Sequence, residues 1–195
     1  MHTANAIFVY LLQTVLALYT IAMLLRFLLQ LVRADFYNPI SQFIVRITNP
    51  LVIPLRRLLP GIGGIDLASL VLTIVLEIAG FYILSALTSL PGPGLPVMLL
   101  WGLLGVAGLL LNIYFFALLA VIILSWIAQG SNNPVIYLLY QLTEPVMAPF
   151  RRILPPIGGL DLSPILVFMV INVLRIILQS MAISVGLPPS LVVAF

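Results

Sequence analysis

Three charged residues lie inside long apolar stretches of this chain: Arg26, Glu77 and Arg175. A charge in hydrocarbon costs about 3 kcal/mol or more unless it pairs or faces water. Measured along helices, both arginines come within reach of Glu77, so either ion pair is feasible. One interpretation is an intramembrane charged cluster in a conduction or coupling path. The other is a buried salt bridge that fixes the order of the helices.

A second group of residues that could do chemistry occurs twice, in two segments with similar sequences. Residues 38–67 align with residues 133–162 at a constant offset of 95, and fourteen of the thirty positions are identical. Most of the identical residues are Pro, Gly, Arg, Asp or Asn, which fix backbone shape or carry charge. The repeat therefore preserves a geometry as well as a hydropathy.

Each segment carries a pair of adjacent arginines, Arg56 and Arg57 in the first and Arg151 and Arg152 in the second. Guanidinium groups can bind lipid phosphates or an acidic partner through two parallel hydrogen bonds. Alternatively, the pairs extend to the headgroups, anchor their segments and set the topology. The sequence leaves both interpretations open.

The remaining repeated residues are suited to helix caps and turns. An Asn before a Pro predicts a helix start, and each Asp is expected to cap the next helix and can also pair with the arginines. The glycine pairs predict a tight turn, with a backbone nest for an anion as the alternative. These residues are Asn38, Gly63, Gly64 and Asp66 in the first segment and Asn133, Gly158, Gly159 and Asp161 in the second.

Composition places these residues in a membrane protein. Of 195 residues, 63% are hydrophobic and 7% are charged, whereas a soluble domain carries about 25% charged residues. The absence of Cys excludes disulfides and thiolate chemistry, and His2 is the only His. We therefore predict no metal site and no cofactor. Without a nucleophile–base pair or a phosphate-binding loop, we expect no enzyme activity, and we expect no direct binding of nucleic acid.

Four apolar runs are long enough to span a bilayer, which takes about 20 residues. They cover approximately residues 6–32, 67–90, 101–127 and 162–187, and a longer, tilted third helix is an alternative. Residues 33–66 and 128–161 connect the spans and are called the arms. Each arm is expected to begin with an amphipathic interfacial helix of about ten residues. The prolines that follow, Pro50, Pro54 and Pro60 in the first arm, should break the chain into short pieces.

The predicted fold is an all-α membrane protein with four transmembrane helices. They form two parallel span–arm–span repeats with pseudo-twofold symmetry, residues 1–94 and 95–195. The positive-inside rule predicts cytoplasmic arms and both termini on the outer, periplasmic side. The basic residues of the arms are Arg33, Arg46, Arg56, Arg57, Arg151 and Arg152.

The motif Pro-x-Arg-Arg-x-x-Pro-x-x-Gly-Gly-x-Asp occurs twice, each time before an apolar span. It resembles the YggT family of bacterial inner-membrane proteins, whose relatives include the YlmG proteins of Gram-positive bacteria and plastids. The resemblance covers nearly the whole chain. The second copy, with Pro164 three residues after Asp161, is closer to the family pattern than the first, which has Ser69 there. The resemblance implies a location in the bacterial inner (cytoplasmic) membrane and provides no catalytic residues.

The resemblance implies a role in osmotic-stress tolerance and ion homeostasis, with cation transport as one route. The alternative is a membrane scaffold or assembly factor for division, nucleoid organisation or cytochrome assembly, which docks partners through its arginine-rich arms. Expected partners are anionic lipid headgroups and membrane proteins, and a homodimer is a further alternative. The residues favour the scaffold, because the arms are repeated while the span charges are not. Glu77 aligns with Asn172, and Arg175 with Gly80.

Overall fold

The computed structural model describes residues 2–88, 93–128, 132–154 and 161–188. Within these ranges the chain folds into six helices and no sheet. Three helices belong to each repeat, in the order span, arm, span. They are α1 (His2–Leu31), α2 (Pro39–Arg56) and α3 (Leu67–Thr88), followed by α4 (Leu95–Ile127), α5 (Pro134–Ile153) and α6 (Ser163–Ser184).

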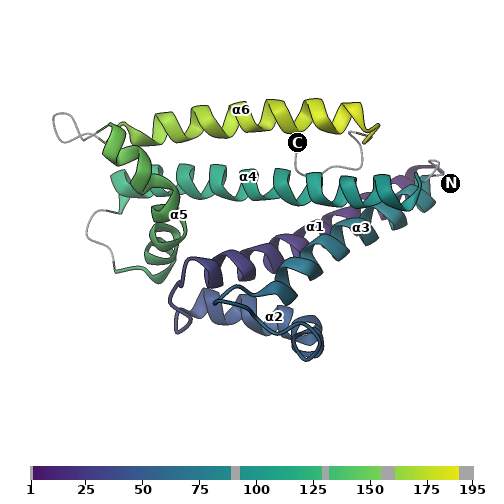
Figure 1. The fold of residues 1–195 in the computed structure, drawn as a ribbon, viewed down its shortest axis with the longest axis horizontal. Coiled ribbons are helices and arrows are strands. Elements are labelled where there is room, and N and C mark those ends of the chain that lie inside the picture. The colour runs from purple at the N-terminus through teal and green to yellow at the C-terminus, as the bar shows by residue number, and fades with distance from the viewer. Residues whose placement is uncertain (1, 89–92, 129–131, 155–160, 189–195) are drawn as a thin grey trace.

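Four of these helices, α1, α3, α4 and α6, are long and apolar enough to cross a membrane. The arm helices α2 and α5 are amphipathic and carry the basic residues near their ends. The two repeats run in the same direction, because α1 and α4 both lead to the end of the molecule where α2 and α5 lie (Figure 1). We call this the arm end. The predicted all-α fold with four spans in two repeats is confirmed.

The arm helices are longer than the sequence predicted. Helix α2 has 18 residues and α5 has 20, and each continues through two internal prolines instead of breaking after the first turns. The prediction of short pieces was wrong for these prolines, although Pro60 does lie beyond the end of α2. The internal prolines are Pro50 and Pro54 in α2 and Pro145 and Pro149 in α5.

Side chains from α1 donate hydrogen bonds to carbonyl groups of α2 on both sides of the one that Pro50 leaves without a helical partner. A proline removes one helical hydrogen bond and crowds the preceding turn. Near this break, the carbonyl oxygen of Val45 accepts a hydrogen bond from Nη1 of Arg26 at 3.3 Å. The carbonyl oxygen of Ile47 accepts one from the hydroxyl of Tyr19 at 3.2 Å. In membrane proteins such donors from a neighbouring helix commonly compensate for a proline.

Helix α4 is the long form of the third span. It begins at Leu95 and has 33 residues, so it is about 50 Å long. The hydrocarbon core of a bilayer is only about 30 Å thick. A helix of this length has to tilt or extend beyond the core.

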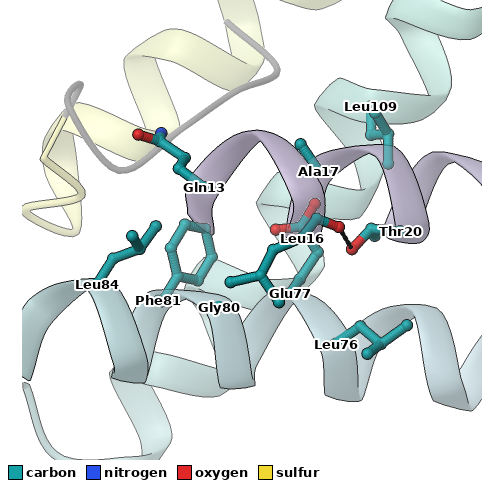
Figure 2. A pocket seen from close by; sticks show the side chains of 10 residues that line it. All are labelled: Gln13, Leu16, Ala17, Thr20, Leu76, Glu77, Gly80, Phe81, Leu84 and Leu109. Carbon is teal, nitrogen blue, oxygen red and sulfur yellow. Dashed lines mark hydrogen bonds between the residues drawn. The ribbon is translucent and has the colours of Figure 1, made fainter. Parts of the chain in front are cut away.

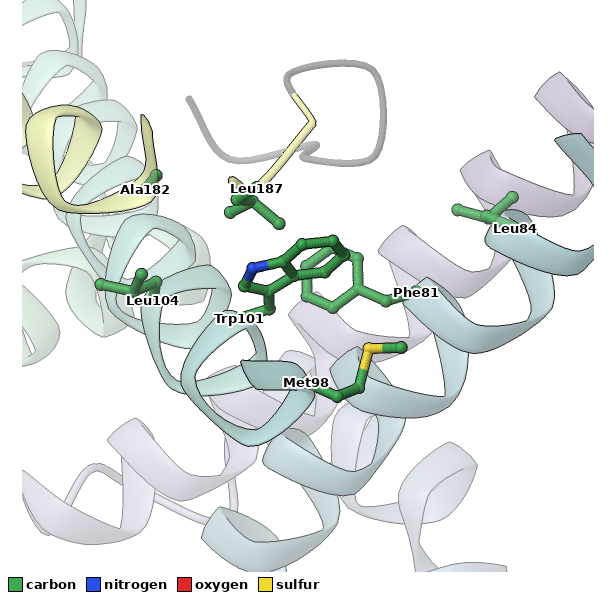
Figure 3. Packing of buried hydrophobic residues seen from close by; sticks show 7 residues of the cluster. All are labelled: Phe81, Leu84, Met98, Trp101, Leu104, Ala182 and Leu187. Atoms are coloured by element: carbon green, nitrogen blue, oxygen red, sulfur yellow. The ribbon is translucent and has the colours of Figure 1, made fainter. Parts of the chain in front are cut away.

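A cluster of buried apolar residues joins α3, α4 and the end of α6 at the end away from the arms (Figure 3). Its aromatic centre is an edge-to-face contact between Phe81 and Trp101, with ring centroids 6.1 Å apart. The indole N–H of Trp101 donates to the carbonyl oxygen of Val185 at 3.0 Å. Gly186, with φ +68°, reverses the chain after α6 and brings Leu187 into the cluster.

Glycines on α4 allow α3 to approach closely. A Cβ atom built on Gly102 would lie 2.5 Å from Cγ1 of Ile78. A Cβ on Gly105 would lie 3.3 Å from the ring of Phe81 and 3.4 Å from the carboxyl group of Glu77. Small residues at such contacts let membrane helices gain dispersion energy over a long interface.

We predict that Gly102→Ala destabilises the protein, whereas Gly80→Ala does not. A Cβ on Gly80 would meet no atom within 4 Å, so the usual helix gain of up to about 1 kcal/mol should remain there. At Gly102 the overlap should lower the free energy of unfolding by about 1–3 kcal/mol. Tryptophan fluorescence during unfolding in detergent measures the free energy of unfolding of both variants. Equal stability of the two would contradict the close contact.

Candidate functional site

A buried arginine joins the three helices of the first repeat at the arm end. Arg26 comes from α1 and is 4% exposed. Its Nη1 atom donates to Oγ1 of Thr48 and to Oδ1 of Asn49, both at 2.8 Å. Its Nε atom lies 3.6 Å from Oδ2 of Asp66, which immediately precedes α3. One side chain therefore links the two spans and the arm of the first repeat. We call this junction the first corner, and the equivalent junction of the second repeat the second corner.

Asp66 is the counter-charge of this corner and is 1% exposed. Nη2 of Arg56 donates to its Oδ2 at 2.6 Å, and the amide of Ser69 donates to its Oδ1 at 3.3 Å. The second bond caps the first turn of α3. Burial acts to raise the pKa of Asp66. Hydrogen bonds from Arg56 and Ser69, together with the charge of Arg56, outweigh burial and hold this pKa below its ordinary value. Asp66 is therefore ionised at neutral pH.

The second repeat contains the same arginine–aspartate bridge in a more open form. Nε of Arg151 donates to Oδ2 of Asp161 at 2.9 Å, and the Asp161 side chain is 33% exposed. Burial acts to raise the pKa of Asp161, but hydrogen bonds from Ser163 and Arg151 hold it below its ordinary value. The bridge is thus repeated, while its burial is not.

Asp161 does not occupy the cap position that the sequence predicted, because α6 begins one residue later than the repeat implies. The structure places Leu162 at the N-cap of α6. The residue that should receive the cap is Pro164, which has no amide hydrogen. Asp161 instead accepts the amide of Ser163 at 2.9 Å, just before the helix.

The third charge at each corner differs between the repeats. Arg26 aligns with Val121, and Asn49 aligns with Glu144. The first corner therefore has two arginines and one carboxylate. The second has one arginine and two carboxylates, because Nη1 of Arg151 donates to Oε2 of Glu144 at 2.6 Å. Burial acts to lower the pKa of Arg151, but its two carboxylate partners raise it above its ordinary value.

The two arginine pairs divide in the same way. The first member of each pair, Arg56 or Arg151, is held by an aspartate. The second members, Arg57 and Arg152, are exposed and form no ion pair within the described residues. Of the four residues predicted to bind lipids or partners, these two have side chains free to do so.

The first glycine pair forms a tight turn between α2 and α3. Gly63 and Gly64 have φ values of +61° and +86°. The flanking residues, Ile62 and Ile65, exchange two backbone hydrogen bonds of 3.2 and 3.0 Å. Two successive positive φ angles characterise a type I′ turn, which glycine adopts without strain. The second pair, Gly158 and Gly159, lies outside the described residues.

The two arms are hydrogen-bonded to each other. Asn38 and Asn133 each cap an arm helix by accepting the amide two residues further on, at 3.0 and 2.9 Å. Nδ2 of Asn38 also donates to the carbonyl oxygen of Pro134 at 2.6 Å. The amide of Asp35 donates to Oε1 of Gln141 at 3.0 Å. The beginnings of both arms thus form one connected surface.

The three span charges do not form the predicted cluster. Arg26 binds Asp66, and Nη2 of Arg175 donates to Oδ1 of Asn112 on α4. The guanidinium carbon of Arg175 also lies 4.5 Å from the centre of the Phe115 ring. Neither predicted ion pair, Glu77–Arg26 or Glu77–Arg175, occurs in the structure. Distance along a helix gives depth in the membrane but not the direction in which a side chain points.

Glu77 instead lines a small cavity between α1, α3 and α4 (Figure 2). Gln13 and Thr20 supply further polar groups, while Phe81 and Leu109 are apolar walls. The cavity volume is about 30 Å³, which is enough to admit water. The cavity can therefore hydrate the carboxyl group, but it does not form a path along the spans.

The sequence contained a signal for some of the partners that were missed, and not for others. Thr48 and Asn49 lie within the repeated segment, and Ser69 lies three residues after a predicted cap. Their hydrogen bonds to Arg26 and Asp66 could have been proposed from these positions. Asn112 lies in an otherwise apolar span, and nothing in its surroundings indicated a link to α6.

Comparison with known proteins supports the internal repeat. The model of the CCB3/YggT family matches residues 5–87 and again residues 100–182. The two matches begin 95 residues apart and also end 95 residues apart. This offset is the one found within the sequence. No solved structure matches the chain.

Several relatives align with the chain. It is 48% identical to the uncharacterized protein PA0392 of Pseudomonas aeruginosa over 189 residues, which cover 96% of each chain. It is 39% identical to the uncharacterized protein YggT of Escherichia coli K12 over 166 residues, 85% of this chain and 86% of that protein. A chloroplastic YlmG homolog of Arabidopsis thaliana is 42% identical over 62 residues, 32% of this chain and 24% of the relative. The two bacterial names state no activity.

We predict that Asp66→Asn destabilises the protein much more than Asp161→Asn. The first change leaves Arg26 buried without its counter-charge, which should lower the free energy of unfolding by about 3–5 kcal/mol. The second removes a partly exposed bridge that contributes about 0–1 kcal/mol. Denaturant titration in detergent micelles measures the free energy of unfolding of both variants. Equal losses would show that the buried corner does not depend on its aspartate.

Proposed function

The chain belongs to the CCB3/YggT family, and from this premise we propose that it is a membrane scaffold that supports osmotic-stress tolerance and ion homeostasis. In this proposal it lies in the bacterial inner membrane with its arms in the cytoplasm. It acts on ion balance by docking other membrane proteins at the arms and does not conduct ions itself. Its four candidate spans provide the anchor.

The observation that carries this proposal is the display of Arg57 and Arg152 at equivalent positions of the two arms. Each follows an arginine that is fixed by an aspartate, so its backbone position is defined. Binding to a preorganised group loses less conformational entropy than binding to a mobile one. Guanidinium groups also suit carboxylates and phosphates, which they bind with two hydrogen bonds.

The distribution of charge supports the cytoplasmic location of the arms. Arg33 and Arg46 lie at the arm end together with the two arginine pairs, and both are exposed. Basic residues near the ends of spans remain preferentially in the cytoplasm. There the anionic headgroups attract each arginine by about 1 kcal/mol. This attraction would hold the amphipathic arm helices against the membrane, where they can meet a membrane-bound partner.

Direct cation transport is the second candidate, and the polar surroundings of Glu77 favour it. A carboxyl group in the middle of a span, with Gln13 and Thr20 in the same cavity, is a chemically suitable cation ligand. The volume of about 30 Å³ counts against it. Transport would require this cavity to open to both sides of the membrane.

We predict that the double substitution Arg57→Gln and Arg152→Gln weakens docking at the arms without unfolding the protein. At about 1 kcal/mol for each arginine, association at the arms should weaken about 30-fold. Cells that lack the protein and carry this variant should grow in hyperosmotic medium no better than the deletion strain, at an unchanged membrane level. Glu77→Gln is the matched control and should restore growth. Restoration by the arginine variant would refute the scaffold.

We also predict no cation flux into liposomes that contain the folded wild-type protein, above the flux into empty liposomes. The Glu77→Gln variant should be equally silent, because the cavity beside Glu77 does not form a path. A flux that disappears in this variant would establish transport beside Glu77. A flux that persists in the variant would place a path elsewhere. Either flux would overturn the proposal of a non-conducting scaffold.

A further inference from the structure

Helix α6 presents a regular row of exposed side chains. It is the least buried of the four candidate spans: only 17% of the residues in its most apolar stretch are buried inside the structure. Six of its exposed residues are separated alternately by four and three positions, which is the heptad spacing of helices that pack along their length. We call this row the α6 seam. Its residues are Ile165, Met169, Asn172, Ile176, Gln179 and Ile183.

Two positions of the α6 seam carry amide side chains in an apolar span. Asn172 lies nine residues after Ser163, about 13 Å along the helix and near its middle. Its Nδ2 donates to the carbonyl oxygen of Phe168 at 2.9 Å. Its Oδ1 atom accepts no hydrogen bond from the described residues, and Gln179 forms none with them. An amide without hydrogen-bond partners is unfavourable in hydrocarbon. Another helix could supply such partners for these groups, whereas lipid tails could not.

The internal repeat shows that a helix covers the equivalent row in the first half of the chain. Shifted by 95 residues, the α6 seam falls on α3, at positions that include Ile74, Glu77, Phe81 and Leu84. Phe81 is 2% exposed and Leu84 is 4% exposed. Glu77 and Phe81 lie against Gly105 of α4. The row that α4 covers on α3 is thus open on α6.

We propose that the α6 seam is a homodimer interface, in which a second copy of the chain supplies the missing helix. Two copies inserted in the same direction place each seam residue at the same depth as its own copy, so the interface is self-complementary. An amide has both a donor and an acceptor, and Asn172 and Gln179 can therefore each pair with themselves across the axis.

The neighbouring arginine is compatible with this arrangement. Arg175 precedes a seam residue, and two copies of it would repel each other if they faced the interface. Its guanidinium group instead lies over the ring of Phe115 and binds Asn112, both on α4 of the same chain. The charge is therefore directed away from the α6 seam, and the apolar and amide groups remain to form the contact.

Cysteine cross-linking in native membranes tests the interface, and the chain has no cysteine of its own. The test compares Ile176→Cys, in the α6 seam, with Ile177→Cys, at nearly the same depth but about 100° further around the helix. Both positions are exposed, at 66% and 49%. With a mild oxidant at low expression, Ile176→Cys should yield at least about five times more disulfide-linked dimer. Equal yields, no dimer, or a link only to another protein would overturn the proposal.

The amides provide a second test that does not depend on cross-linking. Energy transfer between labelled copies in vesicles should show a dimer for the wild type. The double substitution Asn172→Leu and Gln179→Leu should raise its dissociation constant about eightfold, as expected for the loss of two interhelical hydrogen bonds. Circular dichroism checks that the variant remains helical. A monomeric wild type, or a dimer that the substitutions leave unchanged, would refute the α6 seam as the interface. This inference does not rest on the scaffold proposal.

Discussion

The bridge between an arm arginine and the aspartate before the following span closes each repeat. It links Arg56 to Asp66 and Arg151 to Asp161. An unpaired charge or an unpaired backbone group is strongly unfavourable beside hydrocarbon. One bridge pairs two charges and links the end of the arm helix to the start of the following span. The first repeat adds Arg26, which also supplies a donor to the proline-containing arm helix.

The two corners share one arginine–aspartate bridge but differ in net charge. The first corner carries an excess of one positive charge and is buried, while the second carries an excess of one negative charge and is more open. The arginine–aspartate bridge is repeated in both. The two repeats thus retain the same bridge but differ in the net charge around it. The two arms therefore present different electrostatic surfaces.

The sequence predicted the features that depend on neighbouring residues along the chain. The spans, the asparagine caps and the first glycine turn follow from local apolar length and backbone preference. The hydrogen bonds that α2 accepts could not be predicted in this way, because the donors come from Tyr19 and Arg26 on another helix. The partners of Arg175 depend on the rotation of α6 about its axis, which spacing alone does not determine.

The length of α4 gives the molecule a mechanical property. At 33 residues it exceeds the hydrocarbon thickness, and where tilting takes up the excess length, its inclination depends on how thick the bilayer is. When a swelling cell stretches its membrane, the bilayer thins and a more inclined helix fits better. Helix α4 packs against α3, α5 and α6. A change in membrane tension that tilts α4 would therefore also act on the helices packed against it, α5 in the arm and the spans α3 and α6.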